Sequence, residues 1–296
     1  MDKNPLIVIV GGSGFVGSAL CNQLEKADYR VRVLTRKANR CRHLRVLPQL
    51  EVLETSDWSP DGLSKAFAGA YAAINLVGIL NETRRCTFRA AHVDLTRDIL
   101  KACELSGVKR FLHMSALHAD PDGPSAYLRS KGQAEQYLNT FAAPKVNVTM
   151  FCPSVIFGPG DSFLNRFADL LKFAPVFPLA CPNSRFAPVY VYDVVDSFVN
   201  AIEDESSYGQ RIFLCGPNTY SLKELVEYVA KVRGYKRWII GLGQFPSRLQ
   251  AMALQYAPGK PFTMDNYRSL SIDSVCPNGP TCETSLEAMA EKVLLR

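Results

Sequence analysis

The 296-residue sequence predicts an α/β fold: a doubly wound parallel sheet followed by a smaller, interleaved C-terminal domain. Two observations support this prediction. The apolar run Leu6–Val10 is typical of a buried parallel strand and ends in a glycine turn that leads into a helix. Strand-like and helix-like segments then alternate through the first half of the chain. Strand, glycine turn and helix together open a Rossmann-like βαβ unit.

The remaining elements of the sheet domain follow from hydrophobic periodicity. After the first strand we expect five more, at residues 30–34, 52–53, 72–77, 110–115 and 146–151. Helices are expected at residues 15–24, 64–67, 87–106 and 130–141. The third helix is the clearest, because Phe88, Ala91, Leu95 and Ile99 recur near helical spacing.

Beyond Pro153 proline becomes frequent and the pattern changes. Ser221 and Glu224 have the spacing of a capping box at the start of a helix. We expect a strand–turn–helix at 189–201, a strand at 211–214, and helices at 221–232, 249–256 and 285–294. The sheet domain is therefore predicted to comprise residues 1–154 plus 188–215, and the smaller substrate or interaction domain residues 155–187 plus 216–296.

Composition excludes several classes of protein. Hydrophobic residues make up 47% of the chain, yet no apolar run approaches the roughly 18 residues of a membrane helix. The nine cysteines are scattered without a C-x-x-C pair, which predicts reduced thiols and neither a disulfide framework nor a zinc site. The four histidines lack metal-binding spacing, so no metal is predicted. We expect a cytoplasmic protein, or one peripheral at the inner face of the cytoplasmic membrane.

The glycine turn is the first candidate binding site. Gly12, Gly14 and Gly17 fit G-x-G-x-x-G, and Gly11, Gly14 and Gly17 fit G-x-x-G-x-x-G. Glycines let the backbone approach a pyrophosphate, and the following helix N-terminus attracts that anion. The predicted cofactor contacts here are Gly11, Ser13, Gly14, Phe15, Val16 and Gly17.

Residues after the second strand predict which dinucleotide binds. Proteins that select NAD place an acid there for the ribose 2′-hydroxyl, whereas this chain has Arg36 and Lys37. Arginine pairs with a 2′-phosphate, so NADP(H) is predicted over NAD(H), and residues 1–154 plus 188–215 become an NADP-binding domain. Asp57 is expected to bind the adenine or to form a turn before Trp58. Asn75, Leu76, Val77 and Gly78 are expected to line the adenosine side of the cleft.

The acid-free basic stretch from Tyr29 to Leu50 has other interpretations. It would attract nucleic acid, or it is simply a solvated basic face. The net charge of +6 is mild, and we expect no nucleic-acid partner.

Tyr127 and Lys131 form a Y-x-x-x-K pattern and share one helix face. A neighbouring ammonium is expected to lower the pKa of the phenol, which then acts as acid or base in hydride transfer. The pattern follows Ser115, which ends a predicted strand. Tyr127, Lys131 and Ser115 are therefore the predicted catalytic residues, and the first two also hold the nicotinamide half.

Together these motifs resemble an atypical, extended short-chain dehydrogenase/reductase, and more narrowly the family of the NADPH-binding accessory subunit of respiratory complex I (alpha-subcomplex subunit 9), in its bacterial branch. The segments that carry the resemblance are 11–17, 113–117, 125–131, 153–159, 188–194 and 259–265. In that family the resemblance implies NADPH held as a structural cofactor near a quinone-reaction region. It also implies cofactor contacts at Pro153, Val155 and Ile156.

One departure from that pattern bears on catalysis. Dehydrogenases with the full catalytic set usually end the fifth strand with two serines, and the second polarises the substrate carbonyl; here Ala116 takes its place. His92 stands where many relatives carry asparagine. Successive strand side chains point to opposite faces, so Ser115 does not simply replace the missing serine.

Three hypotheses stay open from the sequence. The chain is an NADP(H)-dependent oxidoreductase or epimerase, with a quinone-like or other small apolar carbonyl substrate. Alternatively it is a non-catalytic NADPH-binding accessory or assembly factor of a quinone-linked respiratory enzyme. The third hypothesis, a nucleic-acid-associated regulator, has the least support. Five phenylalanines either line an apolar substrate pocket or pack in the core: Phe163, Phe167, Phe173, Phe177 and Phe186.

Overall fold

The computed structural model describes residues 4–294, with the side chain of Ala290 excluded. The chain forms two compact units. The first comprises residues up to Pro121, Ser130–Cys152 and Val194–Ile212. The second comprises Asp122–Arg129, Pro153–Asp193 and Phe213 onward. Helix α4 begins in the second unit and continues into the first.

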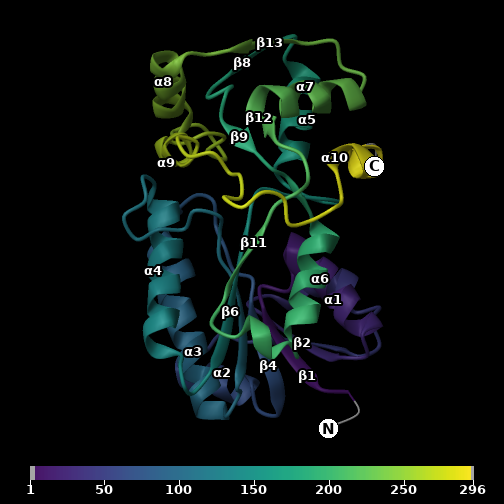
Figure 1. Cartoon of the computed structure of the whole chain (residues 1–296), viewed down its shortest axis with the longest axis vertical. Coiled ribbons are helices and arrows are strands. Elements are labelled where there is room, and N and C mark those ends of the chain that lie inside the picture. The colour runs from purple at the N-terminus through teal and green to yellow at the C-terminus, as the bar shows by residue number, and fades with distance from the viewer. Residues whose placement is uncertain (1–3, 295–296) are drawn as a thin grey trace. The chain divides into compact units, whose positions relative to one another are not determined.

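The first unit is built on a seven-stranded sheet in the order β11–β6–β5–β4–β1–β2–β3 (Figure 1). The pairs β3–β2, β2–β1, β1–β4, β4–β5 and β5–β6 are all parallel. The final residues of β6 and β11 fall in the second unit. The strands are β1 (Leu6–Val10), β2 (Arg30–Thr35), β3 (Leu50–Glu54), β4 (Ala70–Asn75), β5 (Arg110–Met114), β6 (Asn147–Pro153) and β11 (Arg211–Leu214).

The strand order reverses between β1 and β4, because β2 and β3 follow on one side and β5 and β6 on the other. Ligands of doubly wound sheets bind at such a switch point, outside the carboxyl ends of the strands. The predicted Rossmann-like parallel sheet is therefore confirmed, and it fixes where a site is to be sought.

Helices cover both faces of this sheet, with α2, α3 and α4 on one side and α1 and α6 on the other (Figure 1). The apolar face of α3 packs with β1 and β5 in one core cluster that includes Val8, Ile99 and Phe111. The helices are α1 (Phe15–Lys26), α2 (Pro60–Ala66), α3 (Leu95–Ser106), α4 (Ala126–Phe141) and α6 (Val191–Ala201), with 3₁₀ turns at Ala38–Leu44 and Glu205–Ser207.

Two helices differ from the sequence prediction. The segment expected as one helix from 87 to 106 contains a π-helical stretch, Arg89–Asp94, before α3. Helix α4 begins at Ala126 and not at 130, because Asp265 accepts hydrogen bonds from two N–H groups of its first turn. Neither departure leaves a mark in hydrophobic spacing.

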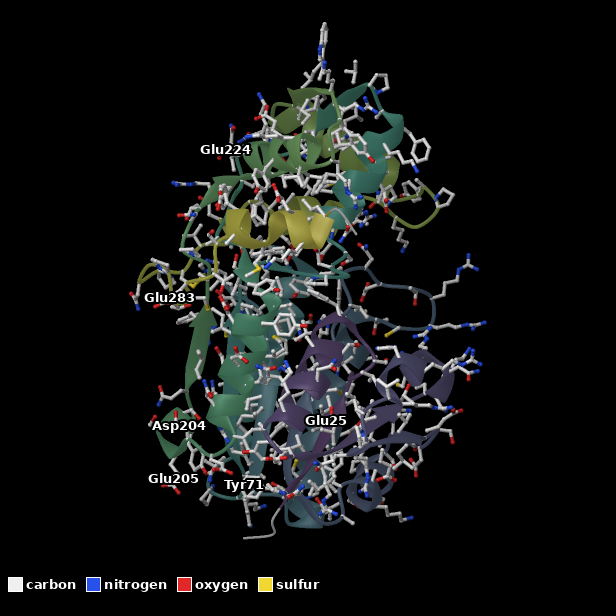
Figure 2. The ribbon with its side chains drawn as sticks, turned by 90° about the vertical axis from the view of Figure 1, so that its right-hand side faces the viewer. Glu25, Tyr71, Asp204, Glu205, Glu224 and Glu283 are labelled. Atoms are coloured by element: carbon white, nitrogen blue, oxygen red, sulfur yellow. A yellow bond between two sulfur atoms is a disulfide. The ribbon has the colours of Figure 1, made fainter. Side chains whose placement is uncertain are left out.

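The second unit has its own core of helices and short two-stranded sheets. The predicted capping box of α7 (Leu222–Val232) is present, with Ser221 and Glu224 bonding reciprocally. Glu224 is labelled in Figure 2. Its strands are β7 (Ile156–Phe157), β8 (Val176–Leu179), β9 (Arg185–Phe186), β10 (Val189–Tyr190), β12 (Tyr220–Ser221) and β13 (Trp238–Gly241). Its helices are α5 (Leu164–Phe173), α7 (Leu222–Val232), α8 (Gln244–Leu254), α9 (Met264–Ser269) and α10 (Leu286–Leu294).

The five phenylalanines divide between the two interpretations left open by the sequence. Four belong to or pack against the core of the second unit: Phe163, Phe167, Phe177 and Phe186. Phe173, at the end of α5, is exposed. Core packing therefore accounts for the four.

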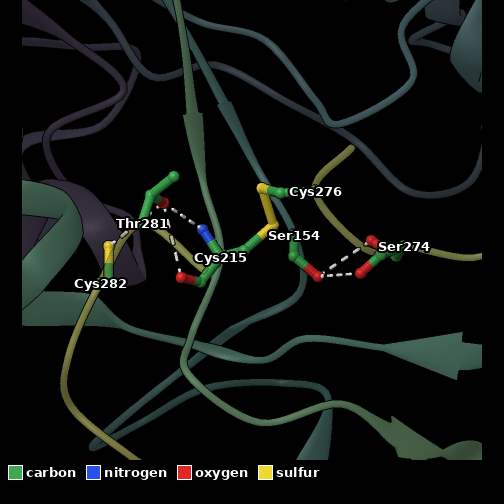
Figure 3. The surroundings of a disulfide bond; sticks show 6 residues. All are labelled: Ser154, Cys215, Ser274, Cys276, Thr281 and Cys282. Atoms are coloured by element: carbon green, nitrogen blue, oxygen red, sulfur yellow. Dashed lines mark hydrogen bonds between the residues drawn. A yellow bond between two sulfur atoms is a disulfide. The ribbon is translucent and has the colours of Figure 1, made fainter. Parts of the chain in front are cut away.

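A disulfide corrects the prediction that the cysteines are reduced. Cys215, directly after β11, is bonded to Cys276 within the second unit (Figure 3). Backbone bonds reinforce the link, since the Cys215 carbonyl accepts from the N–H groups of Thr281 and Cys282. A separation of 61 residues and the absence of a C-x-x-C signal hid this pair from sequence reasoning. Between residues 4 and 294, no helix has the length and apolarity to span a bilayer.

Candidate functional site: a dinucleotide cradle at the switch point

The glycine turn after β1 is closed by contacts that only glycine permits. Gly11 has a φ of +92°, and a Cβ there would lie 3.0 Å from backbone atoms of Leu76 and Val77. A Cβ on Gly17 would lie 2.6 Å from the Gly11 carbonyl oxygen and from the Gly12 Cα. The first turn of α1 therefore packs directly on the backbone of the loop, a contact that the glycine spacing permits.

The N-terminus of α1 is open to an anion. Its N-cap is Gly14, no side chain caps it, and no acid lies in its first turn. The first N–H groups of a helix have no partner within the helix, and they lie at the positive end of its dipole. Ser13, Phe15 and Val16 flank this end and are partly accessible. The predicted phosphate contacts are thus gathered at one helix end, which suits a pyrophosphate.

The end of β4 forms the opposite side of this turn. Asn75 is fully buried, and its side-chain oxygen accepts a hydrogen bond from the Val77 N–H at 3.0 Å. Its amide nitrogen donates to Thr96 Oγ1 at 3.2 Å. Asn75 therefore shapes the loop, and the more accessible Leu76, Val77 and Gly78 are the parts of this segment that a ligand can reach.

Arg36 and Lys37 follow β2 and are exposed. The Thr35 hydroxyl accepts from the Lys37 N–H at 3.2 Å and fixes the turn that presents them. The sequence prediction overlooked Glu54, at the end of the adjacent strand β3, whose carboxylate accepts from the Ala38 N–H at 2.7 Å. One acid therefore lies beside the two cations.

Asp57 forms a turn before Trp58, which is the second of the two roles that the sequence left open for it. Its carboxylate accepts from the Ser59 N–H at 3.0 Å and from the Ser59 hydroxyl at 2.6 Å, and these bonds lower its pKa. The same carboxylate packs on Gly62, where a Cβ would meet it at 2.3 Å. An adenine role would have to use the oxygen that Ser59 leaves accessible.

Lys131 is the central charged group of the first unit. Its ammonium donates to the Met114 carbonyl at 2.9 Å and to the Val77 carbonyl at 3.4 Å. It therefore sits at the carboxyl ends of β5 and β4, beside the loop that Gly11 contacts. The residue is 2% exposed, and burial lowers the pKa of its ammonium to about 8.

Two buried imidazoles, those of His92 and His113, lie within electrostatic reach of Lys131 and stay neutral. Burial and the Lys131 charge lower the pKa of His92 to about 2, and the pKa of His113 is also held well below its usual value. His92 comes from the π-helical stretch, which orients its ring: Nε2 accepts from the Ile79 N–H at 3.1 Å, and Nδ1 lies 2.8 Å from Ser130 Oγ. His92 thus supports the loop after β4 rather than carrying charge.

Ser115 is buried, and its hydroxyl is engaged by a carboxylate that the sequence did not predict. Its hydroxyl donates a short hydrogen bond to Glu135 on α4. Glu135 also forms a 2.9 Å ion pair with Arg211 and accepts from Cys152. The proton of Ser115 is therefore committed to a buried carboxylate. Glu135 escaped the sequence analysis because a partner 20 residues away gives no local pattern.

Tyr127 lies in the second unit, four residues before Lys131 on α4. Asp265 holds this end of the helix, since its two carboxylate oxygens accept from the N–H groups of Ala126 at 2.6 Å and Tyr127 at 3.1 Å. Burial raises the pKa of the Tyr127 phenol to about 12. The predicted lowering of this pKa by Lys131 is therefore wrong for the protein without ligand, because desolvation dominates.

The last three predicted cofactor contacts lie in the second unit. Pro153 is buried at the end of β6. The Val155 carbonyl accepts from the Val189 N–H at 3.0 Å, and Ile156 pairs with Val189 in the β7–β10 sheet. Val155 and Ile156 are half-buried, so part of each stays accessible.

Comparison with known proteins places these features in context. A family model described as the NAD dependent epimerase/dehydratase family matches residues 7–216. The chain is 34% identical over 227 residues to the mouse mitochondrial NADH dehydrogenase [ubiquinone] 1 alpha subcomplex subunit 9. That alignment covers 75% of this chain and 59% of the mouse protein. The predicted resemblance to this subunit family is confirmed.

A second relative, the ceramide reductase of Caulobacter vibrioides, is 28% identical over 67% of this chain and 61% of its own. The chain thus spans about three fifths of the length of both curated relatives. Among solved structures, the UDP-glucose 4-epimerase of Thermotoga maritima aligns with a TM-score of 0.75 and 16% identity, over 98% of this chain and 97% of that one. This likeness concerns the fold.

Proposed function

This chain belongs to the NAD dependent epimerase/dehydratase family, and from that premise we propose that it binds NADP(H) and reduces a quinone-like or other small apolar carbonyl compound. The observation that carries the proposal is Lys131. A lysine that is 2% exposed and bonded to two carbonyls at strand ends costs stability, which is typical of a group with a function.

The glycine turn, the open end of α1 and the loop after β4 meet at the switch point and provide a cradle for the pyrophosphate. Arg36 and Lys37 favour the 2′-phosphate of NADP(H) over NAD(H). Glu54 opposes that preference, but its carboxylate is engaged by the Ala38 N–H. We therefore retain NADP(H) as the proposed cofactor.

Reduced nicotinamide would supply the hydride, and the protein would supply the proton. With a pKa of about 12, Tyr127 keeps its phenolic proton at neutral pH and can donate it to the oxygen of a carbonyl undergoing reduction. Lys131, one helical turn on, would hold the ribose hydroxyls and attract the developing negative charge. The committed proton of Ser115 leaves Tyr127 as the main donor to that oxygen. The ceramide reductase relative supports an apolar substrate.

A second function is favoured by the arrangement around Ser115. With Ala116 in the position of the usual polarising serine and Ser115 bonded to Glu135, the set of carbonyl-polarising groups is incomplete. The protein would then keep NADPH as a structural cofactor and act as an accessory or assembly factor of a quinone-linked respiratory enzyme. The 34% identity to the mouse subunit supports this alternative.

The proposed roles of the two units and the proposed location of the protein are the same for both functions. The first unit would bind the dinucleotide, and the second would bind substrate or partner. The protein would act in the cytoplasm or at the inner face of the cytoplasmic membrane, with a respiratory complex as the partner in the accessory role.

The test combines ligand identification with two variants. Mass spectrometry of the small molecules released from the purified protein should detect NADP(H). Arg36→Asp should weaken NADPH binding about tenfold or more while changing NADH binding little, because a carboxylate repels the 2′-phosphate. Equal losses for both dinucleotides would refute the NADP(H) assignment. Tyr127→Phe should abolish NADPH oxidation by quinones with NADPH still bound. A wild-type protein that binds NADPH and reduces none of the quinones or ketones tried would favour the accessory role.

A further inference from the structure

Helix α8 presents its large apolar side chains to solvent. Phe245, Leu249, Met252 and the following Tyr256 are 80%, 57%, 46% and 85% exposed. Their spacing puts them in one stripe about 60° wide on a helical projection. The opposite side of α8 carries the small buried residues Ser247 and Ala251. The helix is thus attached to its unit by small residues and turns its apolar side outward, the reverse of an ordinary surface helix.

The adjacent β8–β13 sheet repeats this arrangement. Ile239 and Phe177 are in register and pack against the core of the second unit. The alternate residues of β13, Trp238 and Ile240, are 76% and 51% exposed. Side chains alternate across a strand, so Trp238 and Ile240 share the outer face with Val176, the exposed register partner of Trp238.

The sheet and the helix are held together within the second unit. Gln250 on α8 donates to the Pro178 carbonyl of β8 at 3.0 Å, and Leu242, which follows β13, donates to the Leu179 carbonyl at 2.8 Å. Figure 1 shows β8, β13 and α8 at the same end of this unit. We call the exposed set Trp238, Ile240, Phe245, Leu249, Met252 and Tyr256 the apolar face.

Within the segment that carries the apolar face, all charged residues have the same sign. Residues 228–264 contain no aspartate or glutamate. Lys236 and Arg248 lie within this segment and are exposed. The cations of the segment are Lys231, Arg233, Lys236, Arg237, Arg248 and Lys260. On the neighbouring helix α5, Asp169 is exposed and Lys172 lies 5.6 Å over the ring of Phe173.

We propose that the apolar face docks the protein onto an anionic lipid bilayer, with Trp238 and the stripe of α8 entering the headgroup region and the exposed Lys236 and Arg248 meeting lipid phosphates. Tryptophan and tyrosine favour this boundary, and long cationic side chains lie along apolar surface with their charge in the headgroups. A protein partner would use the same aromatic side chains, but the segment that carries them contains no acid, which favours an anionic surface. The proposal uses the second unit alone and needs no dinucleotide, so its failure is separable from that of the proposed function.

The two tryptophans provide a direct probe, because Trp58 packs against the core of the first unit whereas Trp238 is exposed. The full-length Trp58→Phe variant should show a blue shift of emission with vesicles of equal parts phosphatidylcholine and phosphatidylglycerol, and brominated lipid should quench it. Vesicles of phosphatidylcholine alone should give little change. No shift with either vesicle, or equal shifts with both, would overturn the proposal.

Two leucines form a matched pair for vesicle flotation. Leu249 on α8 and Leu105 on α3 are 57% and 52% exposed. Leu249→Glu should lower the affinity for anionic vesicles about tenfold or more, and Leu105→Glu should leave it unchanged. Arg248→Glu should lower it by at least about fivefold, the effect of a single surface cation. NADPH binding and thermal unfolding measured on the same samples report folding. Equal losses from both leucine variants, or concentration-dependent self-association through Leu249 without vesicle binding, would refute lipid docking.

Discussion

Replacing Lys131 with methionine should stabilise the protein while weakening its binding of the dinucleotide. The pKa of Lys131 is about 8 where a free lysine has 10.5, which corresponds to about 3 kcal/mol of cost for holding the charged form at neutral pH. Methionine has a similar length and no charge, so Lys131→Met removes that cost.

Two interactions are lost in return. The Met114 and Val77 carbonyls each lose a donor, at about 1 kcal/mol apiece. The free energy of unfolding of the variant should therefore rise by about 1 kcal/mol near neutral pH. The sign of the pH dependence follows from the same pKa. Between about pH 8 and 10.5 the unfolded chain keeps a proton that the folded chain has lost, so Lys131 makes wild-type stability rise with pH in that window.

Urea unfolding of both proteins near pH 7 and near pH 10, with NADPH titrations of the same samples, measures these effects. Lys131→Met should be the more stable protein near pH 7, should show a smaller gain on going to pH 10, and should bind NADPH at least about tenfold more weakly. A variant that is clearly less stable than the wild type at neutral pH yet binds NADPH normally would show that Lys131 is a structural residue and would refute the reasoning.

Two further perturbations test other parts of the structure. Gly17→Ala gains about 1 kcal/mol of helix propensity but places a Cβ 2.6 Å from backbone that cannot move away, at a cost of about 1–3 kcal/mol, whereas Gly14→Ala meets nothing closer than 3.4 Å. NADPH titration and thermal unfolding should therefore show larger losses for Gly17→Ala, and the opposite ranking would contradict the packing described for the turn. Cys276→Ser should lower the free energy of unfolding by about 2–4 kcal/mol, because it opens a loop of 61 residues. Reductant should produce the same loss in the wild type and none in the variant, and a wild type insensitive to reductant would show that the bond is absent in solution.

Local patterns predicted the frame of the site well. The glycine turn, the alternation of strands and helices, and the pairing of Tyr127 with Lys131 on one helix depend on residues close together in the sequence. For that reason the parallel sheet could be expected before the structure was known, whereas the position of its switch point came from the strand order. The capping box at Ser221 was predictable for the same reason.

Partners from distant segments could not be predicted. Glu135 accepts a hydrogen bond from Ser115, Glu54 accepts one from the turn after β2, and Asp265 caps α4 from 139 residues away. Each bond depends on tertiary contact and leaves no periodic mark in the sequence. The prediction of a lowered pKa for Tyr127 was wrong for a related reason. Desolvation raises this pKa, and desolvation is set by what surrounds the ring and not by the lysine one turn away.

The capped first turn of α4 also fixes a spacing. Tyr127 and Lys131 lie on a single helix whose first turn is fastened by the carboxylate of Asp265. The rise of a helix per residue is constant, so the backbone positions that carry the phenol and the ammonium keep a fixed separation along its axis. A proton donor and its cationic neighbour are therefore spaced by one helical turn, whereas distances between residues from separate segments depend on tertiary contacts.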